Sequence, residues 1–117
     1  MMERVVSAHF PYLPIRLAIR GQTIALEAFL DTGFDGDIVI PPGLVPSGAA
    51  PDHYLLWILA NGSPVQAPAY LGTVQVGPLG AFPVAVTVLG DEPIVGRRLT
   101  DRFRVILDHG RQLVVER

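Results

Sequence analysis

The most informative segment of the chain is Phe29-Leu30-Asp31-Thr32-Gly33-Phe34-Asp35-Gly36-Asp37, in which apolar strand residues lead directly into a carboxylate, a hydroxyl and a glycine. We expect an aspartate at the end of such a strand to be held rigidly. Gly33 lets backbone amides approach its carboxylate closely, where their hydrogen bonds favour the ionised form. The same residue types are common in ordinary strand-ending turns. The tripeptide alone therefore leaves a catalytic loop and a plain turn both open.

The residues before this segment predict a hairpin. Over residues 15–20 the apolar side chains of Ile15, Leu17 and Ile19 alternate with polar or small ones, which indicates a strand with one buried and one wet face. Gly21-Gln22 supplies a turn, and the alternation resumes over residues 23–30. We therefore expect a hairpin to deliver the chain to Asp31.

The residues after this segment predict further short strands. A β-branched run at 37–40 is stopped by two prolines, and residues 54–60 and 64–76 form a long projecting hairpin that reverses at Asn61-Gly62. A valine-rich strand follows at 81–89. One short helix is expected at 97–102, before a closing strand pair at 104–107 and 112–115.

Composition narrows the class of protein. The 117 residues fit a single domain, 1–117, and the formal net charge of −2, with no arginine-rich run, argues against a nucleic-acid partner. The chain has no cysteine, which excludes disulfides, thiolate metal sites and thiol nucleophiles. Because 50% of the residues are hydrophobic, we expect part of the apolar surplus to lie in an interface.

The apolar stretches are too short for a membrane protein. The longest, residues 54–60, falls far short of the roughly 20 residues that cross a bilayer. The first residues lack the basic and apolar regions of a signal peptide. We therefore expect a soluble, cytoplasmic protein with no membrane partner.

No cofactor or metal is expected. His9, His53 and His109 lie in different segments without the spacing of metal ligands. Gly33 and Gly36 precede a strand and not a helix, so they do not form a phosphate-binding loop.

The order of motifs along the chain resembles that of the retropepsin-like aspartic protease family (clan AA), in particular its small bacterial single-domain members. The resemblance rests on residues 31–42, on the Leu59-Ala60-Asn61-Gly62-Ser63 turn, which is similar to a flap tip, and on Pro93-Ile94-Val95-Gly96 before the helix. It covers residues 15–115. It implies an all-β protein, a retropepsin-like closed β-barrel (acid protease fold) with a flap hairpin and one short C-terminal helix.

The resemblance also implies an aspartic endopeptidase that hydrolyses a peptide or protein substrate. That chemistry needs two facing carboxylates, one to accept a proton from water and one to donate a proton to the scissile carbonyl. The chain has one Asp-Thr-Gly, so the second carboxylate must come from a second copy across a twofold axis, as a homodimer. Because two such carboxylates share one proton, best activity is expected below neutral pH.

Site residues are carried over by the same matching. The catalytic set is Asp31, Thr32, which bonds across the twofold axis, and Gly33, which presents its backbone to substrate. The substrate-binding set is Phe34, Asp35, Ala60, Asn61 and Gly62, the last three in a flap tip that closes over an extended peptide. Asp35 contacts substrate backbone, pairs with Arg97 or is a solvated turn carboxylate. The flap itself has an ordinary surface hairpin as its alternative, and Trp57 is expected to pack at its base.

Two other functions stay open. One is a non-catalytic β-barrel peptide-binding or dimerisation module of the same fold. The other is a monomeric β-sandwich adaptor in which Asp-Thr-Gly is accidental. The chain ends, Glu3, Arg4 and residues 114–117, either join an intersubunit sheet or remain frayed.

Overall fold

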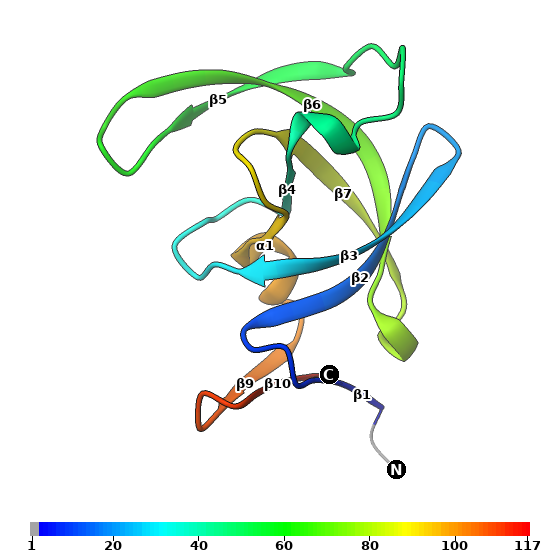
Figure 1. The fold of residues 1–117 in the computed structure, drawn as a ribbon, viewed down its shortest axis with the longest axis vertical. Coiled ribbons are helices and arrows are strands. Elements are labelled where there is room, and N and C mark those ends of the chain that lie inside the picture. The colour runs from blue at the N-terminus through cyan, green and yellow to red at the C-terminus, as the bar shows by residue number, and fades with distance from the viewer. Residues whose placement is uncertain (1–2) are drawn as a thin grey trace.

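The protein is all-β, as the computed structural model of residues 3–117 shows (Figure 1). Two short 3-10 turns, Pro42–Leu44 and Gly77–Leu79, and one helix, α1 (Arg97–Thr100), interrupt the strands. The strands are β1 (Arg4–Ser7), β2 (Tyr12–Ile19), β3 (Gln22–Leu30), β4 (Ile38–Ile40), β5 (His53–Ile58), β6 (Pro64–Gln75), β7 (Ala81–Val88), β8 (Ile94–Val95), β9 (Arg104–Asp108) and β10 (Gln112–Glu116). No helix of this part of the chain is long and apolar enough to cross a membrane.

Six strands form a closed barrel. They pair in the order β2-β3-β8-β4-β7-β6, and a short antiparallel contact between Arg16–Ala18 of β2 and Thr73–Gln75 of β6 closes the ring. The β5 strand lies outside the ring and pairs only with the first half of β6. The second half of β6 pairs with β7, so this one strand belongs to both the hairpin and the barrel.

The barrel core follows the predicted alternation of β2. Leu13, Ile15, Leu17 and Ile19 are each at most 3% exposed, while Arg16 on the opposite face is exposed. Complete burial of an aliphatic side chain stabilises the fold by about 1.5–3 kcal/mol. Because all four lie on one face, β2 is anchored along its whole length, and the observed strand starts three residues before the predicted one.

The turn of the β2–β3 hairpin lies one residue earlier than predicted. Ile19 pairs with Gln22, and the two residues between them, Arg20 and Gly21, both have positive φ, at 51° and 78°. Two-residue hairpin turns of this kind match the twist of the flanking strands. The Arg20 guanidinium extends to Asp52, with both nitrogen–oxygen distances 3.2 Å, and so ties this turn to the foot of β5.

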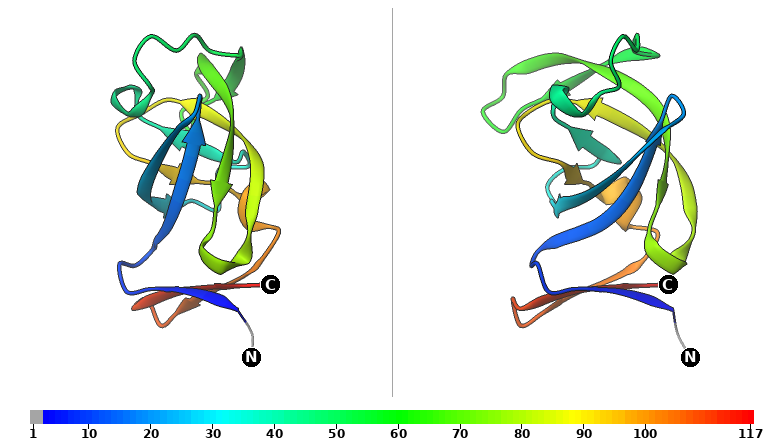
Figure 2. Two further views of the ribbon diagram at one scale, coloured as in Figure 1. Left: turned by 90° about the vertical axis from the view of Figure 1, so that its right-hand side faces the viewer. Right: turned by 45° about the vertical axis from the view of Figure 1, so that its right-hand side comes forward.

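The first and last strands, β1 and β10, lie together at one end of the molecule (Figure 2). There β1, β10 and β9 form a separate three-stranded antiparallel sheet. Glu116, 5% exposed, lies between Arg4 and Arg104, with both nitrogen–oxygen distances 3.8 Å. The terminal strands therefore pair with each other within one chain and are not frayed.

Candidate active site

The loop that follows β3 holds one carboxylate in a fixed position. The backbone N–H of Asp31 donates to the Val95 carbonyl at 3.0 Å, which attaches the loop to β8. The N–H of Gly33 donates to Asp31 Oδ1 at 2.9 Å, and the N–H of Phe34 donates to the Asp31 carbonyl at 3.2 Å. The side chain is therefore oriented by its own loop, as the Asp-Thr-Gly motif predicts.

The segment from β8 into α1 supports the loop from behind. The N–H of Gly96 donates to the Asp37 carbonyl at 2.9 Å, and the N–H of Arg97 donates to the Phe34 carbonyl at 2.8 Å. A Cβ on Gly96 would overlap the carbonyl oxygen of Gly36 and the Phe34 ring, so only glycine permits this close crossing. The crossing that the family resemblance implies for residues 93–96 is thus present.

An aromatic contact joins the loop to the β5–β6 hairpin. The Phe34 and Trp57 ring centroids are 5.0 Å apart with the planes tilted by 56°. Gly36 leaves room for both rings, since a Cβ there would approach each of them within 3.0 Å. The Trp57 indole N–H is buried and has no hydrogen-bond partner among the described residues. Trp57 therefore packs against the Asp31 loop through Phe34, near the tip end of β5 and not at the base of the hairpin where it was expected.

Between loop and hairpin lies a cavity of about 350 Å³. Asp31, Gly33 and Phe34 form one wall, and hairpin residues 57–60 form another. Thr87, Leu89 and Ile94 are among the remaining lining residues. Asp31 is the one ionisable side chain among the described residues that line it. An oriented carboxylate thus faces an apolar space that is roofed by a hairpin.

The structure brings only some of the predicted residues to this cavity. Asp31, Gly33, Phe34 and Ala60 line it. Thr32 and Asp35 lie in the same loop with exposed side chains, and Asn61 and Gly62 form the exposed tip of the hairpin. The tip turn is closed by the N–H of Gly62, which donates to the Leu59 carbonyl at 2.8 Å.

The predicted pairing of Asp35 with Arg97 is absent among residues 3–117. The Arg97 guanidinium instead contacts Asp101 at 3.4 Å, because side chains four residues apart lie next to each other on a helical turn. This leaves substrate backbone or solvent as the partner of the Asp35 carboxylate.

Asp37 has a structural role that the sequence did not indicate. It is 8% exposed, and its Oδ2 accepts a hydrogen bond from the Ala85 N–H at 3.0 Å. The parallel pairing of β4 with β7 begins one residue later, at Ile38 and Val86. The carboxylate therefore extends that ladder by one hydrogen bond. From sequence, an aspartate before a β-branched run is equally consistent with a solvated turn.

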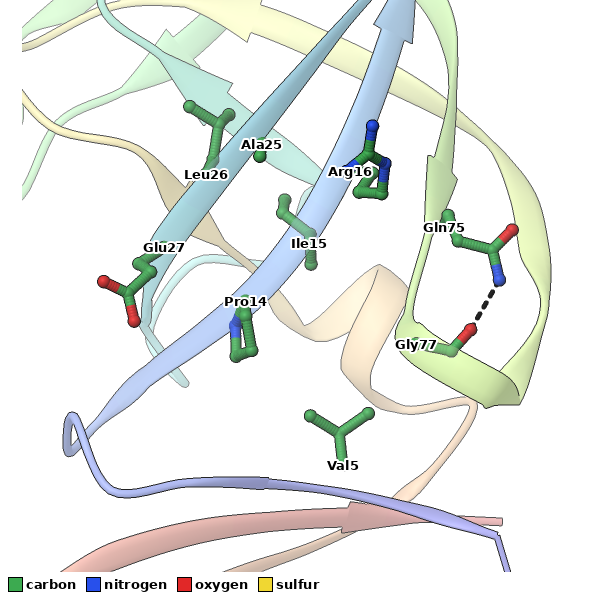
Figure 3. A pocket seen from close by; sticks show the side chains of 9 residues that line it. All are labelled: Val5, Pro14, Ile15, Arg16, Ala25, Leu26, Glu27, Gln75 and Gly77. Atoms are coloured by element: carbon green, nitrogen blue, oxygen red, sulfur yellow. Dashed lines mark hydrogen bonds between the residues drawn. The ribbon is translucent and has the colours of Figure 1, made fainter.

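A larger cavity, of about 550 Å³, lies on the other side of the β2–β3 hairpin, next to β1 (Figure 3). Its ionisable groups are Arg16 and Glu27, and the Glu27 carboxylate contacts His9 at 3.2 Å. Neither group is oriented by a backbone amide, so size alone does not make this space a reaction site. Residues 3–117 contain no group of three or more histidine or acidic side chains that could hold a metal ion.

No protein-family model matches the sequence, and no curated protein matches it either. Among solved structures, the chain is similar to a retropepsin-like aspartic protease from Rickettsia conorii, with a TM-score of 0.64 and 19% sequence identity. The match covers 98% of this chain and 91% of that one. The fold is therefore a retropepsin-like closed β-barrel, with Asp31 on the loop between β3 and β4.

Proposed function

We propose that this protein is an aspartic endopeptidase that acts as a homodimer. The observation that carries the proposal is the Asp31 carboxylate, which accepts the Gly33 N–H at 2.9 Å and opens into an apolar cavity beneath the Phe34–Trp57 contact. The similarity in fold to a retropepsin-like aspartic protease supports the same conclusion.

The proposed reaction is general acid/base hydrolysis of a peptide bond. One Asp31 carboxylate takes a proton from water, and the oxygen attacks the scissile carbonyl, while the other Asp31, protonated, donates its proton to the carbonyl oxygen. The resulting diol collapses with proton transfer to the amide nitrogen and breaks the C–N bond. The cavity wall of one chain contains a single acid, so the second must come from a second copy of the chain.

The neighbouring residues have roles in this dimer. Thr32 is exposed beside Asp31 and makes no side-chain hydrogen bond within the described chain, so its hydroxyl is available to bond to the partner copy across the axis. Phe34 and Ala60 bound the cavity and contact apolar substrate side chains. Asp35, Asn61 and Gly62 lie at its margins and contact the backbone of an extended peptide.

The test compares Asp31→Asn with Glu27→Gln, which changes an exposed carboxylate on β3, the strand that leads to Asp31. Each protein is incubated with apolar peptides at pH 4–6, products are identified by mass spectrometry, and mass in solution is measured by sedimentation. We expect cleavage by the wild type and by Glu27→Gln, a loss of more than about 1,000-fold in Asp31→Asn, and a dimer throughout.

Two outcomes would contradict the proposal. Cleavage that survives in Asp31→Asn would exclude the dyad, and a monomer that cleaves would exclude the shared site. A dimer that binds these peptides without cutting them would support the non-catalytic peptide-binding module instead.

A further inference from the structure

The outer face of β7 leads out of the Asp31 cavity past Thr87, which is covered and only 2% exposed. Val84, Val86 and Val88 point into the core, so the alternate residues 83, 85 and 87, followed by residue 89, face outward. Thr87 and Leu89 line the Asp31 cavity. Six residues of extended strand span about 20 Å, so this stripe leads well away from the reaction site.

Two further cavities lie along the same stripe. One of about 180 Å³ lies over Ala85 and Thr87 and shares Trp57 with the Asp31 cavity. The next, of about 370 Å³, lies over Pro83 and Ala85. These two cavities share Asp37, Ala85 and Arg98 in their walls. Together the three cavities form a stepped path, which we call the β7 groove, from Asp31 to the outer side of α1.

The outer end of the β7 groove carries positive charge. Arg98 and Arg102 lie four residues apart and line it, and neither has an ion-pair partner among residues 3–117. The Arg102 guanidinium rests over the Phe82 ring at 5.1 Å. The one acid in these outer walls is Asp37, whose Oδ2 is engaged by the Ala85 N–H. Residues 54–90, which supply most of the roof and floor, contain no charged side chain.

We propose that the β7 groove binds the segment of the substrate that flanks the scissile bond, and that Arg98 and Arg102 select an acidic side chain on it. At the length of the stripe, that side chain lies about four to six residues from the scissile bond. The substrate is then an extended peptide, apolar at the cleavage site and acidic at this distance. The inference rests on the proposed protease function, because the groove takes its direction from Asp31.

The experiment uses matched peptides that differ only in a single Glu or Gln, placed at successive positions out to six residues on each side of an apolar cleavage site. For the wild type we expect Glu at one distal position to raise kcat/KM by about 3- to 10-fold over Gln, through a lower KM, as solvent-screened charge pairs allow. In Arg98→Gln/Arg102→Gln this ratio should fall to about one. In Arg98→Glu/Arg102→Glu this ratio should fall below one, and a third peptide with Lys at the same position should be cleaved with a higher kcat/KM than the Gln peptide.

The matched control is Arg111→Gln, an exposed arginine in the turn between β9 and β10 that should keep the wild-type ratio. Each variant is its own reference, because the ratio compares two peptides on one protein. The inference would be overturned if the wild type cleaved the Glu and Gln peptides equally well, or if the preference for Glu survived in Arg98→Gln/Arg102→Gln. Cleavage of the peptides in either case would still support the protease function.

A binding measurement separates the two proposals. Fluorescence anisotropy of the labelled Glu and Gln peptides with Asp31→Asn reports the groove without the reaction. Tighter binding of Glu together with no cleavage by the wild type would support the groove and contradict the protease. Peptides that are neither cut nor bound would overturn both.

Discussion

The β2–β3 and β5–β6 hairpins belong to one sheet and are built in opposite ways. The first turns in two residues and buries one complete face in the barrel core. The second turns through the longer loop 59–63 and leaves Leu56 and Ile58 of β5 68% and 66% exposed. Prolines at 64 and 68 also remove two backbone donors from its ladder.

The β2–β3 hairpin is therefore stabilised by contacts within its own chain, whereas the β5–β6 hairpin leaves apolar side chains uncovered. The first gains its stability from the core. The second contacts the Asp31 loop through the pair Phe34 and Trp57 and keeps much of its outer face exposed. A hairpin built in this way is consistent with the proposed function, in which it opens to admit a peptide and closes over it.

The largest expected effect tests this contrast with one substitution at two places. Leu17→Ala in β2 removes a side chain that is 0% exposed, so we expect the free energy of unfolding to fall by about 2–5 kcal/mol. Leu56→Ala in β5 removes one that is 68% exposed, so the loss should stay within about 0.5 kcal/mol. Urea denaturation measures both. Similar losses would show that the second hairpin is packed as firmly as the first.

The next effect concerns the loop on which the second hairpin rests. Gly96→Ala would force a Cβ against the Gly36 carbonyl and the Phe34 ring, and we expect a loss of about 1–3 kcal/mol. Gly43→Ala is the matched control, because a Cβ there meets nothing within 4 Å. Thermal unfolding compares them, and a neutral Gly96→Ala would mean that the crossing can move apart freely.

A smaller effect isolates the contact between roof and loop. Phe34→Leu removes an aromatic pair that contributes about 0.5–1.5 kcal/mol, so the hairpin should open more often. Trp57 is the single tryptophan, and its emission should shift to longer wavelength and its quenching by acrylamide should increase. Phe103→Leu, which loses a pair with Phe82 away from the hairpin, should leave both signals unchanged. Unchanged Trp57 emission in Phe34→Leu would contradict the role assigned to this contact.

The smallest effect depends on pH and concerns Asp52, which contacts Arg20 and so joins the two hairpins. The pKa of Asp52 is lowered, chiefly because the Leu71 N–H donates to its carboxylate, with desolvation opposing and Arg20 contributing. Because the pKa is lower in the folded state, the ionised carboxylate stabilises the fold at pH values above the pKa of the unfolded state. This stabilisation is lost as the pH falls through the pKa of the folded state. Asp52→Asn should therefore reduce the decrease in Tm below about pH 4.

Asp91→Asn, an exposed carboxylate without a described hydrogen bond, is the control for this measurement and should keep the wild-type pH profile. If the profile of Asp52→Asn matches that of the wild type, the Asp52 carboxylate does not contribute to the pH dependence of stability.

Features of the fold that are set by neighbouring residues could be predicted from the sequence. The alternation in β2 identified its buried face, and the apolar approach to Asp31 identified a carboxylate at a strand end. The two-residue strand β8 was not predicted, because its pairing with β3 and β4 joins residues distant in the chain. The hairpin turn was misplaced by one residue because Arg20 adopts a positive φ, which side chains with a Cβ rarely do.

The candidate site divides in the same way. Asp31, Gly33 and Phe34 were recognisable from their motif, and the hairpin from its Asn-Gly reversal. The burial of Asp37 depends on the Ala85 amide of a strand almost fifty residues away, which no local pattern reports. The outward stripe of β7 was hidden for a related reason: in a valine-rich strand both faces look apolar, so the groove side is apparent only in three dimensions.

The double membership of β6 has a mechanical consequence. Ala69 is the residue where the strand changes neighbours, since it pairs with both His53 of β5 and Thr87 of β7. Before it, backbone amides are shielded by a lone edge strand, and after it they lie inside a closed ring. Amide protons of β6 should therefore exchange with solvent quickly before Ala69 and slowly after it. The β5–β6 hairpin can then move while the barrel stays closed.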